Sequence, residues 1–208
     1  MKDKIIIQEA KRVLNAELTG IKSLSKTFNN KFITLVRGII NTKGRVIVTG
    51  MGKSGHIASK ISATLASTGT PSFFVHPAEA SHGDLGMITK DDCILALSNS
   101  GESSELNAII NYSKRYNVPL YSITANSRGI LYKKSTVGLV LKKFNEACSL
   151  NLAPTTSTSM MLILGDAIAV TLLKIKGFNQ EDFKIFYPGG NIGKDLIKVS
   201  EIMHTGKK

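Results

Sequence analysis

The chain of 208 residues contains no tryptophan, two cysteines and few aromatic residues, and each shortage excludes a class of protein. Cys93 and Cys148 have no motif spacing, so they form neither a disulfide framework nor a zinc site. No apolar run reaches the roughly 18 residues needed to cross a bilayer. The apolar stretch at Ile5-Ile6-Ile7 is too short for the core of a signal peptide. We therefore expect a cytoplasmic protein with no membrane partner.

Acidic residues are also scarce, with 15 Asp and Glu against 27 Lys and Arg and a formal net charge of +12. A nucleic-acid-binding protein would gather its basic residues on one patch or helix, often with aromatic residues. Here most basic residues are Lys, they are spread along the whole sequence, and aromatic residues make up only 6%. This pattern favours a solvated, Lys-rich surface over a nucleic-acid partner, and the positive charge would attract anionic substrates.

The remaining composition, 42% hydrophobic and 20% charged, is that of a globular domain. Apolar residues at helical spacing predict helices over residues 5–40, interrupted near Gly20 and Asn29-Asn30. Short buried strands and helices then alternate. The strands are expected at 45–49, 72–75, 93–97, 120–124 and 137–141, and the helices at 54–67, 105–116 and 158–175. This order predicts a doubly wound α/β fold with a five-stranded parallel sheet flanked by helices.

We expect one domain over residues 1–198, made of N-terminal helices at 1–43 and an α/β core at 44–198, followed by a tail at 199–208. In such a fold, ligands bind outside the carboxyl ends of the strands. Three unusual segments of this sequence follow the first, second and third predicted strands. A ligand site is therefore predicted at that edge of the sheet.

The segment Ser98-Asn99-Ser100-Gly101-Glu102-Ser103 follows the third strand and precedes a helix. A glycine permits a tight turn, hydroxyl groups donate hydrogen bonds, and a helix N-terminus adds unpaired N–H groups, which together make an anion cradle. The alternative is a helix start capped by serine, with no ligand. Five hydroxyl or amide side chains among these residues and Ser104 exceed what one cap needs.

The segment Gly50-Met51-Gly52-Lys53-Ser54-Gly55 fits the glycine fingerprint of dinucleotide-binding folds. That fingerprint also requires an acidic residue at the end of the second strand, where this chain has His76-Pro77. Lys53 inside the loop suits a phosphosugar better than a nicotinamide cofactor. An NAD-binding domain nevertheless stays open as a further interpretation.

Three other features of the sequence have both a chemical and a structural interpretation. His76, Glu79 and His82 have spacing compatible with a metal site, but no further Cys or carboxylate pattern completes a ligand set, so we expect no metal. Glu146 follows the fifth strand and could be catalytic or merely solvated. The hydroxyl residues of segment 153–158 could be helix caps or pocket groups.

Taken in order, these segments resemble the arabinose 5-phosphate isomerases, which are sugar isomerase (SIS) domain proteins. The resemblance runs from about Gly44 to His204. It is carried by the glycine and serine segments above together with Ser67-Thr68-Gly69-Thr70-Pro71, His82-Gly83-Asp84-Leu85-Gly86, Glu146-Ala147-Cys148, Ala153-Pro154-Thr155-Thr156-Ser157-Thr158 and Pro188-Gly189-Gly190.

The resemblance implies interconversion of D-ribulose 5-phosphate and D-arabinose 5-phosphate, for Kdo in lipopolysaccharide or capsule, without a cofactor and in a homo-tetramer. It places catalytic roles on Lys53, Glu105, Glu146 and position 187. It places the substrate, and above all its phosphate, against Gly52, Ser54, His82, Ser98, Asn99, Ser100, Ser103 and Thr156. Aldose–ketose isomerisation needs a base and a donor for the developing oxyanion, and we assign these roles to Glu146 and Lys53. Glu105 could share the proton transfer.

Two features depart from the family pattern. Position 187 is Tyr, where the family has His. Residues 199–204 resemble the start of the CBS region that many members carry, which leaves a single-domain member or a truncated chain open. The intact Lys53, Glu105 and Glu146 favour an enzyme, whereas Tyr187 favours the alternative, a phosphosugar-binding SIS module that senses its ligand without converting it.

Overall fold

The computed structural model describes residues 2–186 and contains one parallel sheet of five strands in the order β2-β1-β3-β4-β5. The strands are β1 (Val46–Gly50), β2 (Ser72–Phe74), β3 (Cys93–Leu97), β4 (Leu120–Thr124) and β5 (Val137–Val140). Every neighbouring pair is parallel. The predicted doubly wound, five-stranded fold is confirmed.

The three central strands are apolar on both faces because helices cover both sides of the sheet. All residues of β1, β3 and β4 are buried. The register between β1 and β3 pairs Gly50 with Leu97, the last residue of each strand. The segments that follow β1 and β3 therefore leave the sheet side by side.

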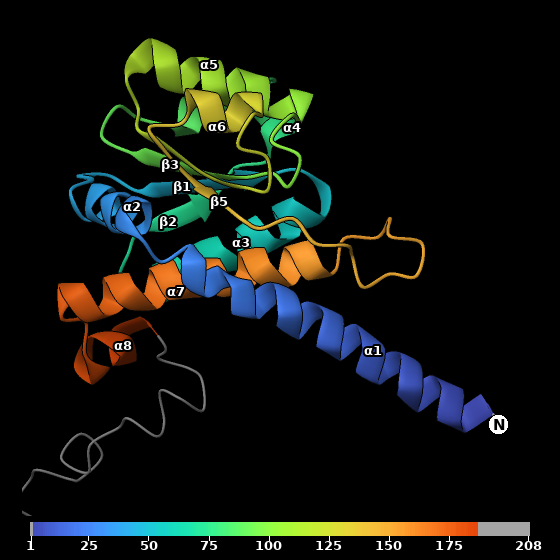
Figure 1. The fold of residues 1–208 in the computed structure, drawn as a ribbon. Coiled ribbons are helices and arrows are strands. Elements are labelled where there is room, and N and C mark those ends of the chain that lie inside the picture. The colour runs from blue at the N-terminus through green and yellow to red at the C-terminus, as the bar shows by residue number, and fades with distance from the viewer. Residues whose placement is uncertain (1, 187–208) are drawn as a thin grey trace, which may run out of the picture.

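The helices form one layer on each face of the sheet (Figure 1). One layer contains α1 (Lys2–Ser23), α2 (Asn30–Ile40), α3 (Gly52–Ser67) and α7 (Thr156–Lys176). The other contains α4 (Pro77–Ala80), α5 (Asn107–Tyr116) and α6 (Ile130–Lys134). The 3-10 turns η1 (Leu24–Lys26), η2 (Asp84–Met87) and η3 (Ser104–Leu106) connect elements, and α8 (Gln180–Phe186) follows α7.

Helix α7 is the one helix in the described part of the chain that is long and apolar enough to cross a membrane by length and composition alone. Its packing gives another reason for that composition. Met161, Leu164 and Ile168 are fully buried in the core, where α7 lies against α1, α2 and α3. A helix in contact with so many neighbours is apolar around much of its circumference.

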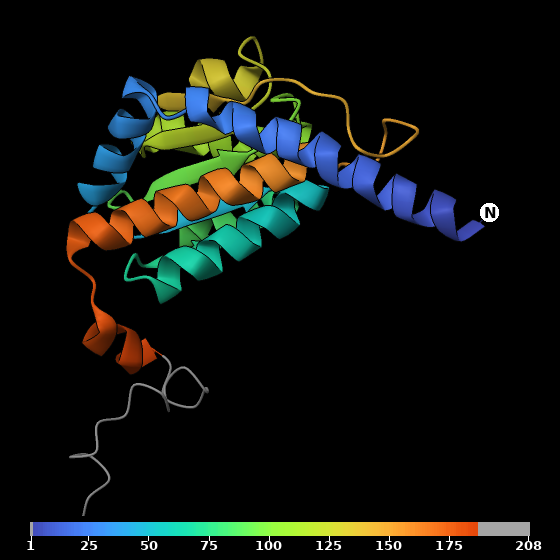
Figure 2. The same ribbon diagram turned by 60° about the horizontal axis from the view of Figure 1, so that its bottom comes forward.

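Helix α1 differs from its prediction, because Gly20 does not interrupt it. A Cβ atom at Gly20 would lie 2.7 Å from Cγ2 of Thr156. Glycine here permits close approach between α1 and the first turn of α7, which the periodicity of the sequence does not reveal. Beyond this contact α1 projects away from the body of the domain (Figures 1 and 2).

The other predicted helices and strands are found, with ends shifted by a few residues. The helix expected at 105–116 begins as the separate turn η3, and the short helices α4, α6 and α8 were not predicted. The split of the domain at residue 43 stays a prediction, and Leu35 and Ile39 of α2 belong to the same core cluster as β1 and α7.

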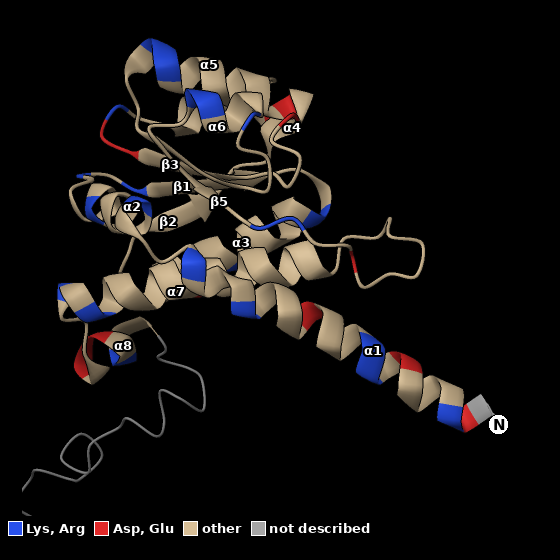
Figure 3. Cartoon of the chain, viewed as in Figure 1, with Lys and Arg blue, Asp and Glu red and all other residues tan. Residues whose placement is uncertain are grey.

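The basic residues are spread over helices of both layers (Figure 3). They lie on α1, α2, α3, α5, α6, α7 and α8 and on several of the connecting segments, such as Lys142 and Lys143. No single helix or face in this view gathers the positive charge of the described residues. This distribution is that of the solvated, Lys-rich surface expected from the sequence.

Substitution of Gly165 by Ala should destabilise the domain although Ala favours helices. A Cβ atom at Gly165 would lie 2.2 Å from Cδ1 and 2.4 Å from Cγ1 of the fully buried Ile61 on α3. Overpacking costs about 1–3 kcal/mol, which exceeds the gain of about 1 kcal/mol in helix propensity. Urea unfolding would measure the loss. Gly86→Ala, which places its methyl in open space, is the control and should leave the midpoint nearly unchanged.

Candidate active site

The serine segment after β3 forms a compact cluster of hydroxyl groups. The Oγ atom of Ser98 lies 2.9 Å from that of Ser103 and 3.5 Å from that of Ser100. The backbone N–H of Gly101 donates to Ser98 Oγ at 3.1 Å, and Gly101 has a φ of 67°. The turn therefore brings together the three serines that the sequence predicts to hold a phosphate.

These serines do not cap the helix that follows. The N-cap positions of η3 and α5 are Ser103 and Leu106, and neither makes a side-chain capping bond. The hydroxyls of Ser98 and Ser100 instead accept from the backbone of their own turn, from Gly101 and Glu102 respectively. The capping interpretation thus does not explain the cluster.

A polar cavity of about 330 Å³ opens next to this turn, between the carboxyl edge of the sheet and the start of α7. Its lining includes Asn99, Lys142, Lys143, Glu146, Thr156 and Ser157. The Oγ1 atom of Thr156 is buried and has no hydrogen-bond partner within the described residues. Of the serine turn, Asn99 lines this cavity, while Ser98, Ser100 and Ser103 lie beside it. Larger hollows of about 520 and 1000 Å³, beside β5 and along α1, do not include Glu146.

Glu146 lies on the segment between β5 and α7, here called the β5–α7 loop (residues 141–155), which contains neither helix nor strand. Its carboxylate Oε2 accepts the backbone N–H of Thr155 at 2.8 Å and of Ser157 at 3.1 Å. The backbone N–H of Glu146 donates to Asn151 Oδ1 at 2.7 Å. Glu146 is thus not a freely solvated side chain but is held by the N-terminus of α7.

These hydrogen bonds also set the ionisation of Glu146. Partial burial acts to raise the pKa of its carboxyl group, but hydrogen bonds from Ser157 and Thr155 outweigh burial and hold the pKa below its usual value. The carboxylate form therefore predominates at neutral pH. In that form the side chain can accept a proton from a substrate in the cavity.

Lys53 and Ser54 lie in the first turn of α3, directly after β1. Gly52 adopts a φ of 58°, and a Cβ atom at Gly55 would lie 2.5 Å from the Gly50 carbonyl oxygen, so this sharp turn needs glycine. Lys53 is exposed, and Ser54 Oγ lies 3.8 Å from Met161 Sδ. The turn places both side chains at the same edge of the sheet as the serine cluster.

The structure does not bring every predicted site residue into contact with the others. Among the described residues, no hydrogen bond or ion pair links Lys53, His82 or Glu105 to Glu146 or to the serine cluster. His82 is exposed after α4, and Glu105 accepts from its neighbour Ser104 at 3.3 Å. No group of three His, Cys, Asp or Glu side chains in residues 2–186 is arranged to hold a metal. Tyr187 lies outside the described residues.

Several residues of the site were not predicted individually. Thr155, Ser157 and Asn151 hold Glu146 through hydrogen bonds, and Lys142 and Lys143 line the cavity. The hydroxyl-rich segment 153–158 could have indicated Thr155 and Ser157. Asn151 has a φ of 54°, a conformation that asparagine tolerates better than most residues, but sequence alone does not show where its side chain accepts.

Comparisons with known proteins identify the family to which this chain is similar. The model of the SIS domain matches residues 39–171. The arabinose 5-phosphate isomerase KdsD of Pseudomonas aeruginosa is 50% identical over 202 residues, covering 97% of this chain and 62% of that protein. KdsD of Salmonella typhimurium is 51% identical over 200 residues, covering 96% of this chain and 61% of that protein. The chain thus spans less than two thirds of these curated relatives.

A solved structure is also similar to this chain, in fold as well as in sequence. The protein of Escherichia coli CFT073 in complex with arabinose 5-phosphate is 38% identical and has a TM-score of 0.87. The match covers 90% of this chain and 100% of that chain. A family model that matches most of the sheet and its helices, and a solved relative matched along its whole length, show that this chain belongs to the SIS domain family.

Proposed function

We propose that this SIS domain interconverts D-ribulose 5-phosphate and D-arabinose 5-phosphate through an enediol intermediate. The observation that carries the proposal is the cavity at the carboxyl edge, where the ionised Glu146 lies with Lys142 and Lys143 beside the serine turn. The names of the two curated relatives and the sugar phosphate bound to the solved relative support this choice of substrate.

The serine cluster is the proposed phosphate site. Ser98, Ser100 and Ser103 bring three hydroxyl groups together, with those of Ser100 and Ser103 each within 3.5 Å of that of Ser98. Each hydroxyl can rotate to donate to a phosphate oxygen, and hydrogen bonds to a charged acceptor are stronger than neutral ones. Gly52, Ser54 and Asn99 are proposed to complete the sugar phosphate site, with Thr156 facing it from α7.

The proton transfer follows from the chemistry of the substrate. The base removes the proton on C2 of the open-chain aldose while the C1 carbonyl oxygen becomes the enediolate oxygen. The C2 hydroxyl then passes its proton to the C1 oxygen, and the proton that the base removed returns to C1, which gives the ketose, so no electrons or atoms enter from outside. Glu146 is the proposed base, and Lys53 is the proposed cation that stabilises the enediolate.

The other proposed roles rest on the resemblance. Glu105 is the second carboxylate that could share the proton transfer, His82 would lie near the sugar, and Tyr187 occupies the position of a family His. A phosphosugar sensor with the same binding site would keep the serine cluster but would not need an ionised Glu146 held at the cavity. The geometry around Glu146 is therefore what favours the enzyme.

A homo-tetramer, a cytoplasmic location and a role in Kdo synthesis belong to the same proposal. Exposed apolar side chains support self-assembly. On α1, Ile5, Ile6 and Ile7 are more than half exposed, and on α7 so are Val170 and Ile175. Apolar surface of this extent on two neighbouring helices is typical of an interface.

The decisive test is conversion of ribulose 5-phosphate to arabinose 5-phosphate by the purified protein without added cofactor or metal. Glu146→Gln should lower kcat about a hundred- to ten-thousand-fold, because general-base catalysis contributes that much. Glutamine can still accept the N–H groups of Thr155 and Ser157, so the loop should keep its shape. Binding of the sugar phosphate, followed by calorimetry, should survive. A parent that binds but does not convert would instead be a sensor.

Ser100→Ala or Ser103→Ala should chiefly weaken substrate binding. Loss of one hydroxyl that donates to a charged phosphate oxygen costs about 1–3 kcal/mol. The measurement is the Kd for arabinose 5-phosphate compared with that for unphosphorylated arabinose. Ser25→Ala is the control, because the Ser25 hydroxyl bonds the Lys22 carbonyl and does not line the cavity. Unchanged affinity in both serine variants would show that this turn does not bind the phosphate.

The protein should sediment as a homo-tetramer whose mass is four times the 22.5 kDa of one chain. Burial of the apolar side chains on α1 and α7 supplies the stabilisation. Replacing Ile6 and Val170 by Glu should shift the assembly to smaller species, because a buried carboxylate is costly. Sedimentation of the parent as a monomer at micromolar concentration would contradict the proposal.

A further inference from the structure

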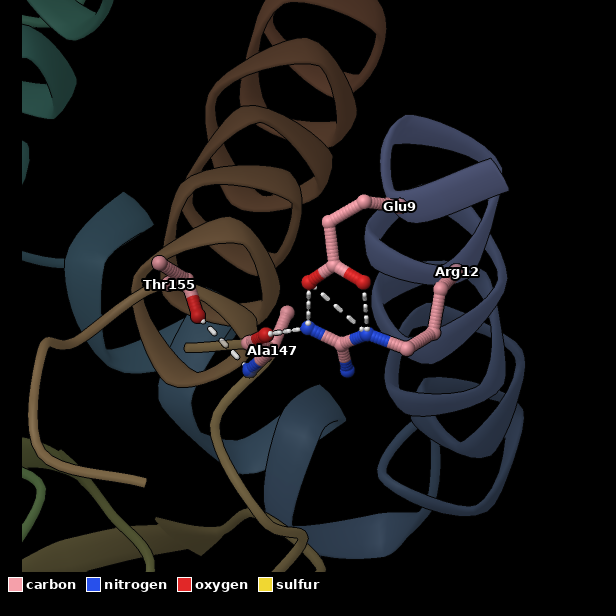
Figure 4. Close-up of polar contacts among 4 residues, drawn as sticks. All are labelled: Glu9, Arg12, Ala147 and Thr155. Carbon is pink, nitrogen blue, oxygen red and sulfur yellow. Dashed lines mark hydrogen bonds and ion pairs between the residues drawn. The ribbon is translucent and has the colours of Figure 1, made fainter. Parts of the chain in front are cut away.

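Helix α1 makes a direct contact with the loop that carries Glu146. The guanidinium of Arg12 donates from Nη2 to the backbone carbonyl of Ala147 at 2.5 Å, although the two residues are 135 positions apart (Figure 4). Ala147 is the neighbour of Glu146 in sequence and is buried. The contact is therefore made at the point of the loop where a shift would move Glu146.

Glu9 fixes the orientation of Arg12. Its carboxylate, one turn earlier on α1, accepts from Arg12 Nε at 2.9 and 3.0 Å and from Nη2 at 2.7 Å (Figure 4). Such a forked pair holds the planar guanidinium in one orientation. On an exposed helix the pair adds little stability by itself. Its effect is to aim Nη2 at the loop.

A continuous series of hydrogen bonds then leads from Ala147 to the Glu146 carboxylate. The backbone N–H of Ala147 donates to Thr155 Oγ1 at 2.8 Å (Figure 4). The same Thr155 donates its own N–H to Glu146 Oε2 at 2.8 Å, and its hydroxyl lies 3.3 Å from that oxygen. Ala147 is thus held between Arg12 on one side and Thr155 on the other.

Helix α1 is itself anchored where α7 begins. Ser159 Oγ on α7 donates to Glu17 Oε2 at 2.7 Å, and Gly20 permits the close approach of α1 near Thr156. Because the β5–α7 loop has no regular structure of its own, its position depends on contacts of this kind. The anchored helix gives Arg12 a fixed base from which to hold the loop.

We propose that Arg12 is a positioning residue that holds the β5–α7 loop so that the Glu146 carboxylate stays in its catalytic position. The inference rests on the proposed function. It assigns a role in the site to α1, which contributes no lining residue to the cavity.

The test compares Arg12→Met with Arg12→Lys and with Lys11→Met, a neighbouring exposed residue on α1. Misplacement of a reacting group lowers the chemical step more than binding, so Arg12→Met should lower kcat about tenfold and leave KM within about twofold. Arg12→Lys retains a donor for the Ala147 carbonyl and should recover part of the loss. Lys11→Met should behave as the parent does. Melting and sedimentation of each variant verify that fold and assembly are unchanged.

A second readout needs no catalysis. The Glu146 carboxyl carbon, assigned by comparison with Glu146→Gln, can be titrated by NMR in the parent and the variants. Looser hydrogen bonds from Thr155 and Ser157 favour the charged form less, so its pKa should rise in Arg12→Met. The charged and titratable groups around it are Lys142, Lys143 and Cys148 of the loop and Arg12 and Glu9 of α1, whereas the first turn of α7 has none. Arg12→Lys separates loss of the charge from loss of the forked geometry.

The kinetic measurement and the Glu146 titration together distinguish failure of the proposed function from failure of the positioning role of Arg12. A parent without isomerase activity would overturn the proposed function, and the titration would still decide whether Arg12 holds Glu146. An Arg12→Met variant with unchanged kcat and an unchanged Glu146 titration would overturn the positioning role. A lower melting temperature with the Glu146 titration unchanged would overturn it too, because Arg12 would then stabilise only the fold.

Discussion

The pairing of β1 with β3 determines where this domain can bind a ligand. Gly50 and Leu97 are register partners, so two chain segments leave the sheet side by side. The segment after β1 leads into α3 on one face, and the segment after β3 leads to α5 on the other. Because the two connections diverge, a crevice is left at their start. The glycine-containing turn after β1 (50–55) and the serine turn after β3 (98–103) both lie there. The proposed binding site depends on the pairing of these two strands.

The N-terminus of α7 supplies the second condition, which is electrostatic. Backbone N–H groups at a helix start have no partner within the helix and favour a negative charge. Glu146 accepts two of them, from Thr155 and Ser157, so the carboxylate is both fixed and kept ionised. The lowered pKa would make Glu146 a weaker base in the proposed reaction, but it keeps the carboxylate ionised over a wide range of pH. Fixation and ionisation thus come from the same contacts.

The sequence predicted local features well and distant contacts poorly. The first buried strand was found because a β-branched run closed by glycine is typical of a strand, and the serine turn was found because its residues are consecutive. The continuity of α1 through Gly20 was missed, because its reason is the approach of Thr156, far along the chain. The contact of Arg12 with Ala147 has no local signal at all. The role of Glu146 was proposed from resemblance, while its hydrogen bonds required the fold.

Helix α1 takes part in both the proposed assembly and the proposed catalysis. Its apolar side chains are exposed and would be covered by another copy, while Arg12 on the same helix holds the Glu146 loop. The Arg12–Glu9 pair is about half exposed, so water competes for both charges in the single chain. Covering α1 in an assembly would exclude some of that water and strengthen the pair, provided its hydrogen bonds stay intact. Assembly would then hold the catalytic loop more firmly without adding any residue to the cavity.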